Sequence, residues 1–223
     1  MDLYFVAALG DAAVAGVGAA GTLMFMVMAI TQILGVSTVA LMSQSVGRKD
    51  QSGANLVFNQ SMMLSVGLGV LTLVVGLLSA DTYMAQIAAD MATREQGAIF
   101  LRWFIPGMAL QFALMAMASA LRATGIVKPG MLVQMITVLL NTILAPILIA
   151  GWGPGPALGV MGAGLASSIS VTVGIVILLY YFIKQEKYVK FDKAQFKPDM
   201  AVWKRMLDIG LPAGGEMLLM FVY

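Results

Sequence analysis

Three polar side chains in otherwise apolar stretches of this sequence are candidates for ion or ligand binding. They are Asp2, Asn141 and Glu216. A polar group inside a membrane-spanning helix is costly, so its presence there calls for a partner or a function. A carboxylate that is withdrawn from water can bind a proton or a cation near neutral pH. These residue types therefore indicate ion and ligand binding rather than covalent catalysis.

Each of the two carboxylates has two interpretations. Asp2 is followed by the apolar residues 3–9, so a span that contained it would bury its charge, whereas a short first segment would leave it in water. Glu216 follows Pro212 by about one helical turn. It is either a coupling or substrate-contacting acid, or a hydrated acid near the membrane surface. The residues around the two acids leave all of these alternatives open.

The amide and the hydroxyl also have two interpretations. Asn141 lies in the middle of an apolar run, where its amide either hydrogen-bonds a neighbouring helix or lines a cavity, and its position favours helix association. Ser167 and Ser168 can bond to carbonyls of their own helix, so hydroxyls alone say little. The nineteen methionines offer either an adaptable ligand lining or ordinary packing.

The composition argues against an enzyme, a resident metal and a nucleic-acid partner. The chain has no Cys and no His, which removes the usual zinc ligands and the usual neutral-pH proton shuttle. It has no phosphate-binding glycine loop, no nucleophile with a base and no cluster of metal ligands. Its net charge is only +2, and the basic residues lie in loops rather than in one patch. We expect neither catalysis nor a cofactor.

The candidate residues have to be positioned by membrane-spanning helices. Hydrophobic residues make up 60% of the chain and charged residues 11%, against roughly 25% charged in soluble domains. A helix needs roughly 20 apolar residues to cross a bilayer. The sequence therefore predicts an all-α integral membrane protein, a polytopic helical bundle. The expected spans are 12–46, 56–80, 98–121, 131–150 and 160–183, with partial spans at 1–9 and from 209.

Two of these spans contain expected irregularities. The run 12–46 would be roughly 50 Å long as a helix, so it has to tilt, kink or break, and Gly35 is the natural place. Pro106 lies within 98–121, where neighbouring groups can satisfy the carbonyl that it frees. In the last long span, small residues recur every four positions and predict a helix-packing face: Gly162, Ala166, Ser170 and Gly174.

The positive charges predict the orientation of the bundle. Eleven Lys and Arg residues lie in one set of alternate loops and only Arg94 in the other, with Arg102 inside a span. The positive-inside rule places the first set in the cytoplasm. This set is Arg48, Lys49, Arg122, Lys128, Lys184, Lys187, Lys190, Lys193, Lys197, Lys204 and Arg205. The expected organisation is a bundle at 1–183, a cytoplasmic Lys-rich linker at 184–205 and the start of a second bundle at 206–223. The linker is either an amphipathic helix on anionic lipid or an ordinary inside loop.

Five motifs in order along the chain resemble the MATE family of multidrug and toxic compound extrusion antiporters. No single motif is specific for this family, but the order of the five motifs and the spans between them are specific for it. They are Asp2 to Gly10, Ala40 to Asp50 with its Gln44 and Gly47, Arg122 to Gly125 followed by Lys128 and Pro129, Asn141 to Pro146 followed by Gly159 to Ser170, and Ile209 to Ala213.

The resemblance implies a fold and roles for the candidate residues. MATE proteins consist of two six-helix bundles, so the chain would form the N-terminal lobe, with an incomplete first helix and only the start of the second lobe. By position, Asp2 would take part in proton or cation coupling, and Asn141 and Ser167 would belong to its polar cluster. Ala145 stands where many prokaryotic members have Asp. Glu216 lies about one turn before the acid of some members.

The resemblance further implies a function. We expect a cation-coupled antiporter, driven by H⁺ or Na⁺, that exports organic and often cationic compounds across the bacterial inner membrane. Its partners would be a small organic substrate, membrane lipid and the C-terminal bundle of the same protein. Two alternatives remain open at this point: a lipid-linked or polysaccharide flippase of the same superfamily, and a non-transporting membrane scaffold.

Overall fold

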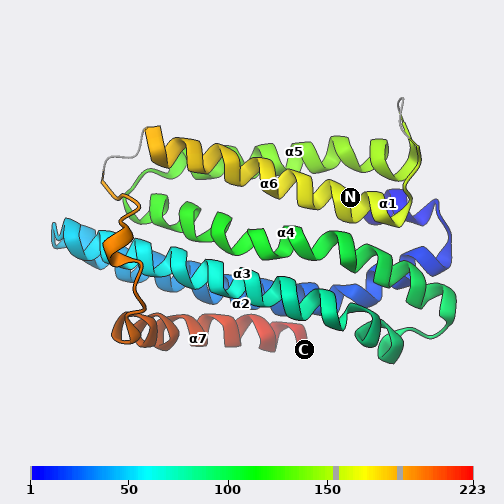
Figure 1. Cartoon of the computed structure of the whole chain (residues 1–223), viewed down its shortest axis with the longest axis horizontal. Helices are drawn as coiled ribbons and strands as arrows, with labels where there is room; N and C mark the ends of the chain where they lie inside the picture. The colour runs from blue at the N-terminus through cyan, green and yellow to red at the C-terminus, as the bar shows by residue number, and fades with distance from the viewer. Residues whose placement is uncertain (1, 153–155, 185–187, 223) are drawn as a thin grey trace. The chain divides into compact units, whose positions relative to one another are not determined.

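The structure is a computed structural model that describes residues 2–152, 156–184 and 188–222, with the side chains of 2–4 and 217–222 outside the described part. The described residues are almost all helical (Figure 1). The α-helices are α1 (Asp2–Ala7), α2 (Asp11–Gly47), α3 (Gln51–Ile87), α4 (Met91–Ala123), α5 (Val127–Ala150), α6 (Val160–Lys184) and α7 (Met200–Val222). A short 3-10 helix, Lys193–Gln195, lies between α6 and α7.

Five of these helices, α2 to α6, are long and apolar enough to cross a membrane. Their outer faces are apolar: Leu78 on α3 is 79% exposed and Ile183 on α6 is 71% exposed. Helices that are apolar all round bury themselves in a large core or in lipid. This confirms the predicted all-helical fold with five spans.

Neither α2 nor α4 is broken at the position where the sequence predicted an irregularity. α2 is one continuous helix of 37 residues, and Gly35 is a packing position instead of a break. A Cβ at Gly35 would lie 3.0 Å from the Cγ of Met115, so a larger residue here would press on this side chain of α4. Pro106 lies inside α4, which continues past it.

Aspartates begin several of the helices. The Asp50 carboxylate accepts the backbone N–H of Gly53 at 2.8 Å before α3, and that of Asp90 accepts Thr93 N–H at 2.7 Å before α4. Such caps satisfy backbone donors that a helix start leaves free. The bond from the Thr93 backbone, helped by the Thr93 side chain, lowers the pKa of Asp90 below its ordinary value.

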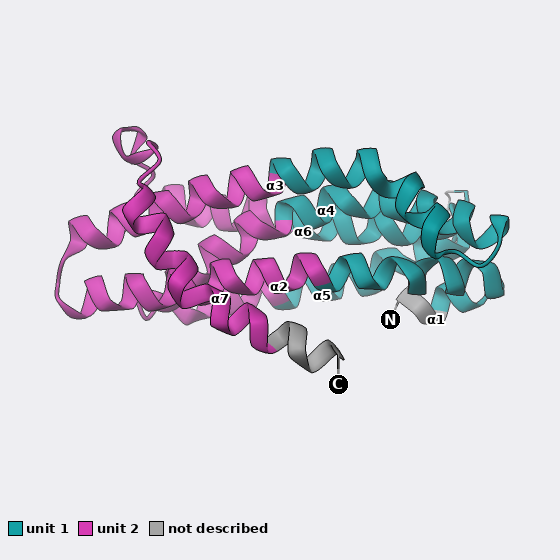
Figure 2. Cartoon of the chain, turned by 90° about the horizontal axis from the view of Figure 1, so that it is seen from below, with its two compact units in different colours: residues 1–25, 70–110, 135–173 teal, residues 26–69, 111–134, 174–223 magenta. Residues whose placement is uncertain are grey.

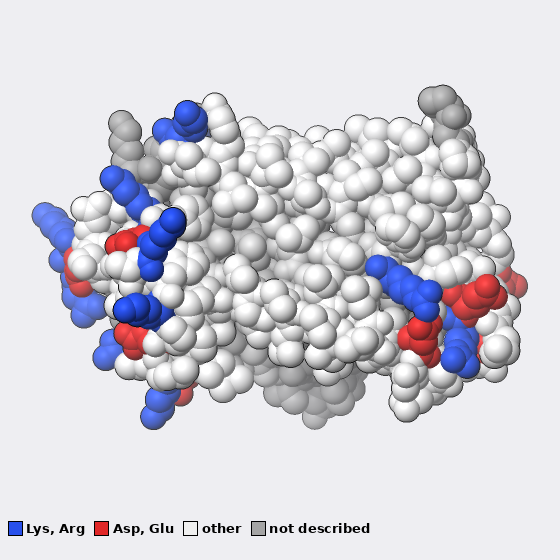
Figure 3. Space-filling view, viewed as in Figure 1, with Lys and Arg blue, Asp and Glu red and all other residues white. Residues whose placement is uncertain are grey.

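The chain divides into two compact units, and each long helix contributes to both (Figure 2). Unit 1 consists of residues 1–25, 70–110 and 135–173, and unit 2 of residues 26–69, 111–134 and 174–223. Of the 13 Lys and Arg residues, only Arg94 and Arg102 belong to unit 1. Lys and Arg are blue in Figure 3, and all of them except Arg94 and Arg102 belong to unit 2, many of them around the start of α3 and in the segment after α6.

The segment between α6 and α7 is irregular. Over its described residues, 188–199, only the three residues of the 3-10 helix are helical, and α7 begins at Met200. The alternative of an amphipathic helix through this segment is therefore wrong for these residues. α7 itself packs on α2 within unit 2, because a Cβ at Gly210 would lie 2.5 Å from the carbonyl oxygen of Ile33.

Candidate functional site

The structure brings two of the four candidate residues together in unit 1. The side-chain amide of Asn141, on α5, donates to Oγ of Ser167, on α6, at 3.0 Å. Both side chains are partly buried. The amide therefore joins two helices, and its carbonyl oxygen is a hydrogen-bond acceptor in an otherwise apolar bundle.

Close packing of α6 fixes where Ser167 lies. A Cβ at Gly162 would collide with the carbonyl of Leu148 on α5, and a Cβ at Gly164 would lie 2.8 Å from the carbonyl oxygen of Phe100 on α4. Glycines on two sides of α6 thus let two other helix backbones approach closely. The expected small-residue face is real, and its members Ala166 and Ser170 are buried.

Ser168, next to the candidate Ser167, is bonded to another helix. Its Oγ accepts the backbone N–H of Gly107 at 3.0 Å and donates to the carbonyl of Trp103 at 2.6 Å. In a regular helix the Gly107 N–H would bond directly to the Trp103 carbonyl, but Pro106 disturbs this turn. The hydroxyl bonds to both of these backbone groups in the turn beside Pro106. From the sequence, Ser168 was expected to bond to a carbonyl of its own helix. The sequence feature that could have indicated its bond to α4 is a serine pair in one span and a proline inside another.

α5 offers no carboxylate beside Asn141. Ala145, one turn further along α5, is fully buried, so an apolar methyl group occupies the position at which the family resemblance implied an acid in many members. Asp2 begins α1, but its side chain lies outside the described residues. α1 itself is packed in unit 1, because Val6 is fully buried and the ring of Phe5 lies edge-on to Trp152 at 6.0 Å.

Glu216 is placed differently from the other candidates. It belongs to α7 in unit 2, and its side chain is exposed. The neighbouring Gly214 faces α2, where a Cβ would collide with Ile33. Glu216 is therefore not a member of the Asn141–Ser167 pair.

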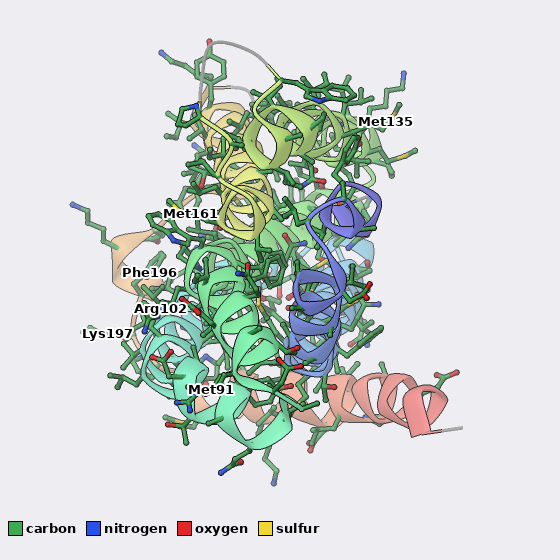
Figure 4. The ribbon with its side chains drawn as sticks, turned by 90° about the vertical axis from the view of Figure 1, so that its right-hand side faces the viewer. Met91, Arg102, Met135, Met161, Phe196 and Lys197 are labelled. Atoms are coloured by element: carbon green, nitrogen blue, oxygen red, sulfur yellow. The ribbon has the colours of Figure 1, made fainter. Side chains whose placement is uncertain are left out.

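A hollow of about 440 Å³ lies in unit 1 between the α1–α2 turn and the starts of α4 and α6. Its lining side chains are almost all apolar, with Gln96 as the exception, but polar atoms contribute about as much of its surface as apolar atoms do. Met161, labelled in Figure 4, is one of the lining residues.

Arg102 is neutralised within unit 1. Its guanidinium lies 2.6 Å from a carboxylate oxygen of Asp81, and both side chains are about half exposed, at 56% and 50% (Figure 4 labels Arg102). A flippase for phosphate-bearing cargo would need an unpaired cationic cavity, and this arginine does not supply one. Among the described residues, no three Asp, Glu, His or Cys side chains gather as a metal-ligand set.

Comparison with known proteins agrees with this architecture. Residues 1–147 match the family model MatE. The chain is 28% identical over 218 residues to "Probable multidrug resistance protein YoeA" of Bacillus subtilis (strain 168), which covers 95% of this chain and 46% of the relative. The chain therefore spans about half the length of the curated relatives that it matches.

Two solved structures show the same helical arrangement. They are described as the inward-facing and the outward-facing conformation of a multidrug resistance MATE family transporter of the MOP superfamily. Each is 28% identical to this chain with a TM-score of 0.89. The alignments cover 97% and 99% of this chain, and 49% and 48% of the solved chains. The fold of this chain is thus equally similar to both conformations.

Proposed function

The chain belongs to the MatE family, and from this premise we propose that it forms the first half of a transporter that exports organic, often cationic, compounds. The observation that carries the proposal is the Asn141–Ser167 pair, a polar group held between two membrane-spanning helices of a bundle that resembles multidrug transporters. Transporters of this general type place their sites between two halves and expose them alternately to each side of the membrane.

In the proposed cycle the motion lies between the two halves of the transporter. Close glycine contacts such as Gly107 against Ser168 oppose internal movement of α4 and α6.

Asp2 is the proposed coupling residue, and the coupling ion is H⁺ or Na⁺. Ion binding would neutralise the carboxylate and weaken its hold on a cationic substrate, and ion release on the other side would restore the negative site. Because Ala145 supplies no second carboxylate, Asp2 would have to bind both the coupling ion and the cationic substrate. Asn141 would contribute a hydrogen bond to the substrate or the ion through its carbonyl oxygen.

The test is efflux of a fluorescent organic cation by a chain of the relatives' full length, in which this sequence forms the first half. We expect Asp2→Asn to abolish efflux at unchanged expression. The matched control is Asp11→Asn, which removes an exposed acid at the start of α2 and should retain efflux. Normal efflux by the Asp2 variant would remove this residue from the mechanism.

A further inference from the structure

In unit 2, the linker between α6 and α7 is attached to α3 by side-chain amides. Gln60 donates to the carbonyls of Gln195 and Lys197 at 2.8 and 2.7 Å, and its own carbonyl accepts the backbone N–H of Asp199 at 3.0 Å. Gln60 is fully buried. The Gln60 amide thus satisfies backbone N–H and C=O groups of the irregular linker that have no partner within a regular helix or sheet.

Two further amides of α3 extend this attachment toward the start of the helix: Asn59, next to Gln60, and Asn55, about one turn earlier. Asn59, also fully buried, donates to the carbonyl of Lys190 at 2.9 Å and accepts the N–H of Asp192 at 2.9 Å. Asn55 accepts the N–H of Lys190 at 2.7 Å. We call Asn55, Asn59 and Gln60 the amide clasp. The clasp holds residues 190–199 of the linker against α3.

The clasped linker and the start of α3 enclose a hollow of about 500 Å³. Its lining residues are Gln51, Ser52, Asn55, Tyr188, Lys190, Phe191, Asp192, Lys193 and Gln195. Lys190 and Lys193 are exposed cations at this hollow. The carboxylate of Asp192 is engaged by the N–H of Ala194 at 2.9 Å, where it caps the 3-10 helix. The hollow is therefore polar and carries a net positive charge.

Apolar side chains continue the same linker beyond the hollow. Phe196 is 39% exposed and Met200 is 67% exposed, with Lys197 between them in the sequence. Figure 4 labels both Phe196 and Lys197 on the left of the view. Exposed aromatic and apolar residues interleaved with lysines are typical of segments at a membrane interface. The hollow itself lies at the ends of two candidate spans, α3 and α6.

We propose that this hollow binds the headgroup of an anionic phospholipid of the cytoplasmic leaflet. Lys190 and Lys193 would contact the phosphate, and Phe196 and Met200 would lie against the acyl chains. Basic pockets beside membrane-spanning helices on the cytoplasmic side bind such headgroups. A free phosphate would use the lysines but would leave the adjacent apolar side chains uncovered, so a lipid fits both features. The proposal does not depend on what the protein exports.

The experiment is native mass spectrometry of the protein as its gene encodes it, with phosphatidylglycerol or phosphatidylcholine added. The test variant is Lys190→Gln/Lys193→Gln. The matched control is Lys128→Gln/Lys204→Gln, which removes two exposed cations of unit 2 that do not line the hollow. We expect the test variant to bind phosphatidylglycerol roughly tenfold more weakly, since each lysine near an anionic surface contributes to binding. The control should bind as the unmodified protein does.

Three outcomes would overturn the proposal. Equal loss of phosphatidylglycerol in both variants would show a general charge effect rather than a site. Equal binding of phosphatidylcholine and phosphatidylglycerol to the unmodified protein would remove the role of the anionic headgroup. Displacement of the lipid by excess inorganic phosphate at matched ionic strength would show a free-anion site.

Discussion

At the scale of single residues, two adjacent serines of α6 have different partners. Ser167 accepts the Asn141 amide from α5, while Ser168 completes a hydrogen-bonded turn of α4 beside Pro106. Residue type singled out Asn141 and the family resemblance singled out Ser167, but they could not tell which neighbouring helix each hydroxyl faces. That depends on how α6 is rotated, and the rotation is set by glycine contacts with two other helices.

Replacing Ser168 tests the bridge to α4. In Ser168→Ala the Gly107 N–H and the Trp103 carbonyl lose their common partner inside the bundle. We expect the free energy of unfolding to fall by about 1–3 kcal/mol, the range for leaving buried polar groups unsatisfied. Thermal unfolding in detergent measures the change.

Ser170→Ala is the matched control for this prediction. Ser170 is equally buried, but its hydroxyl bonds only to the carbonyl of Ala166 in its own helix, at 2.7 Å. That carbonyl can keep its backbone bond without the hydroxyl, so we expect a smaller loss. If both variants unfolded at the same temperature, Ser168 would have no special role at Pro106.

At the scale of helices, hydropathy predicted the spans better than their ends. The expected spans 131–150 and 160–183 correspond closely to α5 (Val127–Ala150) and α6 (Val160–Lys184). The expected 56–80 is much shorter than α3 (Gln51–Ile87) because its first turns are polar. Asn55 lies outside the expected span, yet it is helical and half-buried, since it accepts the backbone N–H of Lys190 from a linker 135 residues away.

The start of α4 provides a pH-dependent test. Because the pKa of Asp90 is lowered in the folded state, its stabilising contribution is present above the unfolded pKa and is lost as the pH falls through the folded value. Asp90→Asn keeps a cap but cannot titrate. We expect the melting temperature of the unmodified protein, relative to this variant, to fall on acidification below the ordinary aspartate value of 3.8. A difference that stayed constant with pH would contradict the proposed charged cap.

At the scale of the whole molecule, the charge distribution predicts which ends of the helices share a side of the membrane. Eleven of the 13 Lys and Arg residues belong to unit 2, whereas unit 1 contains Asp11, Asp81 and Asp90. Composition and hydropathy predicted the membrane class and the helical fold, and five motifs in order carried the family resemblance. The role of Asp2 beside Asn141 was implied only by that resemblance.

Single cysteines test this orientation directly, since the chain contains no cysteine of its own. We expect Lys128→Cys, at the start of α5, to react with a membrane-impermeant maleimide only after the cytoplasmic side is opened. Met91→Cys, at the exposed start of α4, should react in intact cells. The reverse labelling pattern would invert the topology.

The amide clasp also constrains where the backbone can bend when two halves move. Gln60 and Asn59 fix residues 190–199, and Gly210 and Gly214 bring α7 against Ile33. The first part of α7 therefore travels with the helices before it. In the proposed cycle, a swing of the second half would then be taken up beyond Gly214, inside α7, and not in the lysine-rich connection that precedes it.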